Sequence, residues 1–149
     1  MFTYICLGSN DLARSARFYD AALGALGLKR CDTSGEASWD GWLGWGTYKD
    51  QGATEVALWV GRPFDGAPAT AGNGTMVALQ AGSWAQVQEF HAAALANGGT
   101  SEGAPGLRTQ YNPDFYAAYV RDPDGNKLAV VCRGYTEPRG TRVSGRPPV

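Results

Sequence analysis

The sequence predicts an α+β fold of two tandem βαβββ modules whose mixed sheets form a concave cleft. The first observation behind this prediction is an internal repeat, because ARFYDAALGALG at residues 16–27 aligns with QEFHAAALANGG at residues 88–99, 72 positions later. At the same offset, the apolar runs EVALWV and KLAVVC correspond. The second observation is the order of elements, since a strand, a helix and further strands occur in both halves. Each module is too small to bury its own sheet, so the two sheets should combine around a shared surface.

The composition sets the class of protein. A chain of 149 residues with 44% hydrophobic content is long enough for one domain with a substantial core. Thirteen basic and fourteen acidic residues give a net charge of -1, which offers no electrostatic basis for binding nucleic acid. No apolar run approaches the roughly 20 residues of a membrane-spanning helix, and no signal peptide is recognisable. We therefore expect a cytoplasmic protein with no membrane partner. Its three cysteines, Cys6, Cys31 and Cys132, should be free thiols.

The first module, residues 1–61, begins with a β-rich run at residues 4–8. Asn10 or Asp11 then caps a helix in which apolar residues recur at helical spacing until Gly27 ends it. Strands are expected around residues 29–33, 42–49 and 55–60. Residues 62–73, RPFDGAPATAGN, are rich in Pro, Gly and Ala and are predicted to form a linker.

The second module, residues 74–133, repeats this order. After a strand at residues 75–80, Ser83 and Gln86 form a capping box that begins a helix. Residues 101–114 are expected to form a loop over the pocket. The module closes with a hairpin, residues 115–121 and 127–133, about the turn Asp-Pro-Asp-Gly-Asn at residues 122–126. Residues 134–149 are predicted to be a tail outside the single domain, residues 1–133.

Side chains alternate along the predicted strands, which separates two faces of each sheet. One face is consistently apolar and should pack under the helices: Ile5, Leu7, Val56, Leu58, Val77, Leu79, Leu128, Val130 and Cys132. The opposite face is small, aromatic or polar: Tyr4, Cys6, Glu55, Ala57, Trp59, Met76, Ala78, Gln80, Lys127, Ala129, Val131 and Arg133. Such a lining on a concave sheet is typical of a small-molecule pocket.

Three segments carry a resemblance to a known family: LGSNDLARSARFYDAALGALGL, GNGTMVALQAGSWAQVQEFHAAALANGG and GLRTQYNPDFYAAYVRDPDGNKLAVVC. Their order and spacing resemble the vicinal oxygen chelate superfamily, which includes the glyoxalases, the bleomycin resistance proteins and the extradiol dioxygenases. The resemblance implies the glyoxalase/bleomycin-resistance-like fold, a homodimer, and a cleft that in many members holds a divalent metal. It also implies where the metal ligands would stand: Tyr4 and Met76 on the first strands, Ala57 and Ala129 on the last.

These four positions do not supply a metal site. A divalent metal needs imidazole nitrogens and carboxylate oxygens, and methyl, thioether and neutral phenol groups do not replace them. His91 is the only histidine in the chain, so a site with several histidines cannot be built elsewhere. We therefore expect no metal and no other cofactor, and we do not expect the metal-dependent glyoxalase or dioxygenase activities. Whether the protein is an enzyme stays open.

The remaining candidates compete with ordinary structural roles. Glu55, Cys6 and Lys127 are the candidates for acid, base or nucleophile, although Glu55 facing Lys127 or Arg133 would more simply be an ion pair at the rim. His91 is interpreted as a helical histidine fixed by packing. Trp59 is the aromatic residue expected to stack on a ligand.

The residues expected to contact a ligand follow from these considerations. They are Tyr4, Cys6, Glu55, Ala57, Trp59, Met76, Ala78, Arg108, Tyr111 and Ala129, of which Arg108 and Tyr111 would lie at the rim on a loop. The hypothesis that the sequence favours is a protein that binds a small, partly aromatic or apolar molecule in a cleft without metal. The alternative is a metal-independent lyase or isomerase of the same family.

Overall fold

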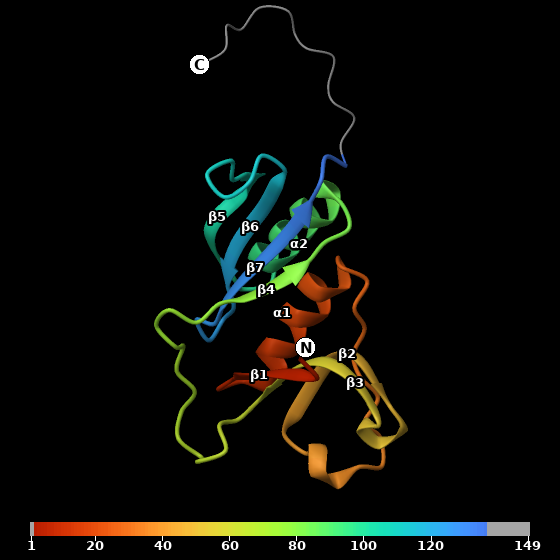
Figure 1. Ribbon diagram of the computed structural model, residues 1–149. Coiled ribbons are helices and arrows are strands. Elements are labelled where there is room, and N and C mark those ends of the chain that lie inside the picture. Colours follow the sequence, from red (N-terminus) through yellow and green to blue (C-terminus); the bar gives the residue numbers. More distant parts are fainter. Residues whose placement is uncertain (1, 137–149) are drawn as a thin grey trace, which may run out of the picture.

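The computed structural model describes residues 2–136 as two similar halves (Figure 1). The first half contains β1 (Tyr4–Gly8), α1 (Leu12–Gly24), β2 (Trp42–Lys49) and β3 (Thr54–Gly61). The second half contains β4 (Val77–Gln80), α2 (Trp84–Ala96), β5 (Thr100–Leu107), β6 (Phe115–Arg121) and β7 (Lys127–Arg133). The predicted tail, residues 134–149, lies outside the described residues from 137 onward.

Each half builds one mixed sheet, and the two sheets share the same order of three strands, to which the second adds an edge strand. The first sheet has the order β1-β3-β2 and the second has the order β4-β7-β6-β5. In both, the first strand runs parallel to the last strand of its half, while the remaining pairs are antiparallel. The predicted α+β fold with two related halves is thereby confirmed. Neither helix is long and apolar enough to cross a membrane, and the described residues contain no other that is.

The first sheet has three strands because the strand expected at residues 29–33 does not form. Only Arg30 makes a bridge, to Trp45 of β2, and the backbone of Cys31 donates to the Gly44 carbonyl at 2.8 Å. Beyond this contact, the Asp32 side chain accepts a hydrogen bond from the Ser34 backbone at 3.0 Å. This local turn satisfies the backbone in place of a ladder partner, so the chain leaves the sheet.

The second sheet gains a strand that the sequence did not indicate. Residues 100–107 form β5 rather than the predicted loop, and they pair antiparallel with β6. The pairing shifts register on both sides of Gly103. An edge strand tolerates such bulges and also tolerates Pro105, whose missing N–H would break a central strand. The Gly and Pro content that suggested a loop is therefore compatible with an edge strand, and the loop is shortened to residues 108–114, which include Arg108 and Tyr111.

Both helices begin at the predicted caps. Asp11 is the cap of α1 and accepts from the Arg14 backbone at 2.9 Å. Ser83 caps α2 by accepting from the Gln86 backbone at 3.2 Å. The Gln86 side chain reaches back to the Gly82 backbone at 2.7 Å, one residue before the position of a standard capping box.

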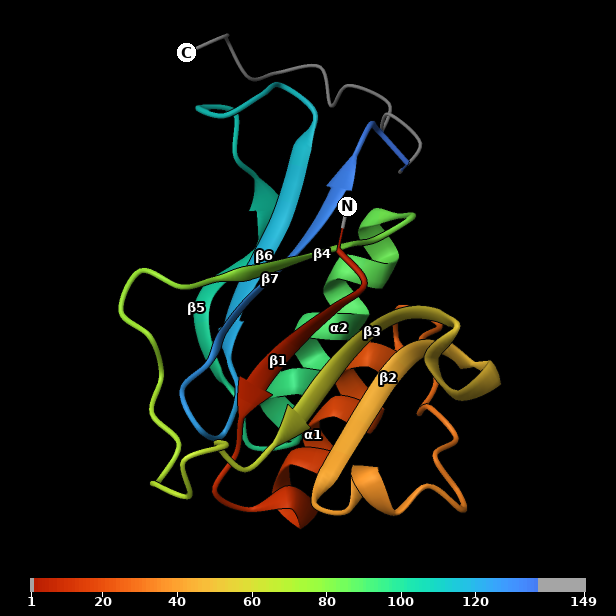
Figure 2. The same cartoon turned by 60° about the horizontal axis from the view of Figure 1, so that its bottom comes forward.

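The two helices pack against each other, and one face of each sheet covers them (Figure 2). The core runs without interruption through both halves, because Phe18 and Tyr19 of α1 and Phe90 of α2 are all fully buried. Most residues of the predicted apolar face lie in this core or pack against it. Val56 is the exception, with 65% of its surface exposed. It stands beside the hollow described below rather than under a helix.

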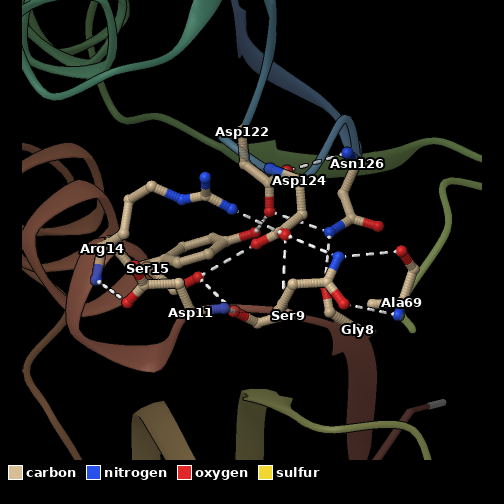
Figure 3. A network of polar contacts seen from close by, with 11 residues as sticks. Gly8, Ser9, Asp11, Arg14, Ser15, Ala69, Asp122, Asp124 and Asn126 are labelled. Carbon is tan, nitrogen blue, oxygen red and sulfur yellow. Dashed lines mark hydrogen bonds and ion pairs between the residues drawn. The ribbon is translucent and has the colours of Figure 1, made fainter. Parts of the chain in front are cut away.

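A network of polar contacts joins the start of α1 to the turn between β6 and β7 (Figure 3). The Tyr19 hydroxyl donates to the carboxylate of Asp122 at 2.6 Å, and Arg14 pairs with Asp124 at 2.9 Å. The Asn126 side chain donates to the Gly8 carbonyl at 3.0 Å. Asp122 is only 4% exposed. Because buried charges are costly unless hydrogen-bonded, this network fixes how the two halves sit on each other.

The segment between β3 and β4 is held against the first half. The Asn10 side chain donates to the Ala69 carbonyl at 2.9 Å and accepts from the Ala69 backbone at 2.8 Å. A methyl group added at Gly8 would stand 2.9 Å from the Ala69 side chain, so the absence of a side chain there permits the close approach.

Candidate functional site

A hollow of about 470 Å³ lies where the two sheets meet. β1 and β4 are the edge strands that face this junction, each at the end of its sheet. The wall includes Tyr4, Val56 and Ala57 from the first sheet and Ala78 and Gln80 from the second. Its size falls within the range of about 300–1,000 Å³ that is usual for small-molecule sites. We call it the seam hollow.

The seam hollow brings together two of the four positions at which metal-binding relatives would carry ligands. Tyr4 and Ala57 are direct partners in the ladder of β1 and β3. In the second half, Ala129 pairs with Ala78, while Met76 precedes β4 by one residue. From the second sheet, the seam hollow includes Ala78 rather than either of these two residues. Met76 lines a different hollow, and Ala129 is only 1% exposed.

These side chains do not fit a metal ion. None of the four carries a carboxylate or an imidazole. In residues 2–136, no group of three or more His, Cys, Asp or Glu side chains is placed to hold one. The chemistry that the seam hollow offers is apolar contact, with the Thr3 hydroxyl, the Tyr4 phenol and the Gln80 amide as polar groups.

A second hollow, of about 550 Å³, adjoins the first along β4. Ala78, Leu79 and Gln80 line both. Its remaining wall includes Phe115 of β6 and Arg133 of β7. Neither of these two was among the residues expected to bind a ligand, although alternation had placed Arg133 on the correct face. We call it the Arg133 hollow.

Tyr111, one of the two predicted rim residues, lines a third hollow of about 510 Å³, whereas Arg108 does not. Met76, Tyr111 and Lys127 line it. Lys127 lies 3.8 Å from Glu102, whose carboxylate also accepts from Arg121 at 2.6 Å. The hydrogen bond and charge of that arginine lower the pKa of Glu102. The ion pair expected between Lys127 and Glu55 is thus replaced by one within the second sheet.

Arg108 is held by contacts with β5 and β6. Its guanidinium lies 5.6 Å from the ring centre of Tyr119 and donates to the Ala104 carbonyl at 2.6 Å. These contacts anchor the turn that follows β5. Arg108 therefore has an observed structural role, and its predicted contact with a ligand stays a prediction.

Trp59 is enclosed by other aromatic rings. Trp39 stacks on it with ring centres 3.9 Å apart, and Tyr48 meets it edge-on at 5.4 Å. The Trp59 indole N–H donates to Glu55 at 2.6 Å, and the residue is only 1% exposed. A Cβ at Gly44 would lie 2.4 Å from this ring, so glycine makes room for it. Stacking of a ligand on Trp59, as the sequence suggested, would require Trp39 to move.

The three candidates for catalysis do not converge. Cys6 is exposed on β1 and lines a separate hollow of about 460 Å³ beneath residues 62–70. Burial, and then the charge of Glu55, raise the pKa of the Cys6 thiol, which disfavours the nucleophilic thiolate. Glu55 is engaged by Trp59, and Lys127 belongs to the other sheet.

His91 is a helical histidine held by packing and one contact, as interpreted from the sequence. Its Nε2 lies 2.9 Å from the Ser101 hydroxyl, between α2 and β5. Burial lowers the pKa of the imidazole, which favours its neutral form. This contact joins α2 to β5 and lies within the packing of the second half.

Comparison with known proteins identifies the family. The model of the Glyoxalase/Bleomycin resistance protein/Dioxygenase superfamily matches residues 2–130. The chain belongs to this superfamily. No curated protein is significantly similar to it.

Solved structures of the superfamily share the fold. A glyoxalase/bleomycin resistance protein from Albidiferax ferrireducens T118 is 37% identical, with a TM-score of 0.74, and the match covers 90% of this chain and 99% of that one. A family enzyme from Burkholderia phytofirmans PsJN is 16% identical, with a TM-score of 0.65 over 89% of this chain and 98% of that one. A glyoxalase-related enzyme from Fulvimarina pelagi is 20% identical, with a TM-score of 0.63 over 89% and 88%. The last two show similarity of fold alone.

Proposed function

We propose that this superfamily member is a cytoplasmic protein that binds a small, partly aromatic or apolar molecule in the seam hollow, without the metal used by other members. The observation that carries the proposal is the seam hollow itself. Its walls are mainly apolar and include the ladder partners Tyr4 and Ala57, which stand where metal-binding relatives would carry ligands. An apolar cavity with a few polar groups is suited to hold an organic molecule by burial.

The exposure of the lining supports the same proposal. Tyr4 is 54% exposed and Ala78 is also accessible, so a ligand can reach both sheets from solvent. Burial of apolar surface contributes about 25 cal/mol per Å², and an aromatic side chain such as Tyr4 adds stacking to that contribution. The ligand would thus be held by burial of its apolar surface and by complementary shape rather than by a bond to a metal.

We also propose that the protein acts as a homodimer. Large apolar side chains are also exposed outside the seam hollow: Phe64, Met76, Leu95, Leu107 and Tyr111. Exposed apolar surface of this kind commonly marks a protein interface. Light scattering coupled to size-exclusion chromatography should give the mass of two chains, and the mass of one chain at micromolar concentration would contradict this part of the proposal.

The binding proposal is tested with neutral aromatic compounds such as indole, 2-naphthol and phenylacetamide. Binding should raise the melting temperature and change the tryptophan fluorescence, and it should persist in EDTA because no metal takes part. Ala78→Phe fills the hollow from an exposed strand position and should abolish binding while the fold is kept. Ala92→Phe, at an exposed position on α2, is the matched control and should bind like the wild type.

Two results would contradict the proposal. One is the absence of any shift or fluorescence change across the panel. The other is equal binding by Ala78→Phe and the wild type. Loss of binding in EDTA would contradict the metal-free character of the site and leave the location of the site to be judged from Ala78→Phe.

A further inference from the structure

The Arg133 hollow extends the seam hollow toward a charged end. The two share three consecutive residues of β4, from Ala78 to Gln80. The seam side is mainly apolar, whereas the far side ends at an arginine. A ligand longer than a single ring would therefore meet two different environments along one path.

Arg133 is the cation of this sheet that lacks an acidic partner. Lys127 and Arg121 both contact Glu102. Within residues 2–136, Arg133 forms no ion pair, and Asp114 in the neighbouring loop accepts a hydrogen bond from the Gly134 backbone instead.

The Arg133 guanidinium is nevertheless held in place. It lies 4.4 Å from the ring centre of Phe115, which is its direct partner in the ladder of β6 and β7. A guanidinium that lies over an aromatic ring loses little freedom on binding, and the N–H groups along its edge still point outward. The Phe115 ring thus holds the Arg133 guanidinium at one side of the hollow.

Gln80 supplies a second polar group on the same hollow. It pairs with Val131 of β7, two residues before Arg133, so the two side chains are diagonal neighbours on one face of the sheet. Gln80 is exposed, and its amide forms no side-chain hydrogen bond with any residue from 2 to 136. Between them, Val131 and Ala78 provide an apolar floor and Phe115 provides an aromatic wall.

We propose that the ligand carries a carboxylate, held by Arg133 and Gln80, and that its apolar or aromatic body extends along β4 toward the seam hollow. The proposal rests on the function proposed above and specifies the chemical class of its ligand. A planar guanidinium matches the two oxygens of a carboxylate in a bidentate pair, and the Gln80 amide can donate a further hydrogen bond.

The test compares phenylacetate with its neutral analogue phenylacetamide by NMR titration of the ¹⁵N-labelled protein. Phenylacetate should bind at least about tenfold more tightly, as expected for charge-assisted hydrogen bonds. Amide signals of β4 and β7 should shift most. Arg133→Gln should remove this preference, and Gln80→Leu should reduce it. Arg17→Gln removes the same charge from an exposed position on α1, away from the hollow, and it should leave the preference unchanged.

The outcomes separate this proposal from the one on which it rests. Equal binding of the two probes, or a preference that survives Arg133→Gln, would overturn the carboxylate assignment while the seam hollow remains a binding site. Inorganic phosphate that binds as tightly as phenylacetate would also overturn it, because an apolar body would then contribute nothing. If neither these probes nor the neutral panel binds, both proposals fail.

Discussion

Removal of one oxygen atom from Tyr19 should weaken the junction between the two halves. The Tyr19 side chain is fully buried, and its hydroxyl donates to Asp122 at 2.6 Å. Tyr19→Phe keeps the contacts of the ring with Phe18 at 4.9 Å and Trp45 at 5.2 Å. The substitution therefore deletes one hydrogen bond to a buried carboxylate and little else.

The size of the effect follows from what remains around Asp122. Its carboxylate still accepts from the Asp124 backbone and from the backbone and side chain of Asn126. The charge is not left unpaired, so the cost should be that of one hydrogen bond to a charged group, about 1.5–3 kcal/mol. For a chain of this size, this corresponds to a fall in melting temperature of about 3–12 °C.

Urea unfolding and thermal melts followed by circular dichroism measure this effect. Tyr116→Phe is the matched control, because the Tyr116 ring is also in the core but its hydroxyl accepts only from the neutral Gln88 amide, at 3.0 Å, in a partly buried contact. Its loss should cost about 0.5–1.5 kcal/mol. The reasoning would be refuted if Tyr19→Phe were as stable as the wild type, or if the two substitutions cost the same.

Three further predictions concern pH, thiol reactivity and packing. Burial, and then the Asp122 charge, raise the pKa of Tyr19 well above its usual value, so on raising the pH the unfolded chain loses this proton before the folded protein does. Above about pH 10 the wild type should therefore lose about 1.4 kcal/mol of stability per pH unit more than Tyr19→Phe. Parallel curves of stability against pH for the two proteins would contradict this. Glu55→Gln should lower the raised pKa of Cys6 and speed its alkylation by iodoacetamide at pH 8, whereas an unchanged rate would show that Glu55 has no influence. Gly44→Ala places a Cβ 2.4 Å from the buried indole of Trp59 and should destabilise the protein by about 1–3 kcal/mol. Gly24→Ala, whose Cβ would meet nothing within 4 Å, should stabilise the protein by about 0.5–1 kcal/mol. If urea unfolding showed the same change in stability for both variants, the packing argument would be refuted.

The parts of the fold that depend on local patterns were predictable. Alternation identified the strands of both sheets except β5. The cap of α1 was narrowed to Asn10 or Asp11, and that of α2 was predicted from the pair Ser83 and Gln86. The two errors also have local causes. At residues 29–33, the turn at Asp32 and Ser34 ends the pairing with β2, and at residues 100–107 glycine and proline in an edge strand looked like a loop.

The candidate site was less predictable because it depends on contacts between distant parts of the chain. Nothing in the sequence near Trp59 shows that Trp39 covers it, since β2 and the turn into β3 separate the two residues along the chain. Similarly, the partner of Lys127 is Glu102 because β5 exists, and β5 was not expected. The alternation did place Gln80 and Arg133 on the pocket face, but only the structure shows that they line one hollow.

The turn at residues 122–126 combines a feature that the sequence predicted with one that it did not. Its residue types predicted a tight turn, and Gly125 has the positive φ of 92° that such a turn requires. Its second role, as the polar junction with α1, depends on Tyr19 and Arg14, which lie more than a hundred residues earlier. Turn chemistry is local, and the choice of polar partners is not.

A crystal structure of the protein with the tightest ligand from the two panels tests the central claim most directly. We predict density for the ligand in the seam hollow, in contact with Tyr4, Ala57 and Ala78, and no metal ion among them. A ligand bound elsewhere, or a metal ion coordinated at these positions, would contradict the proposal that this member of the superfamily binds its ligand by apolar contact in the seam hollow.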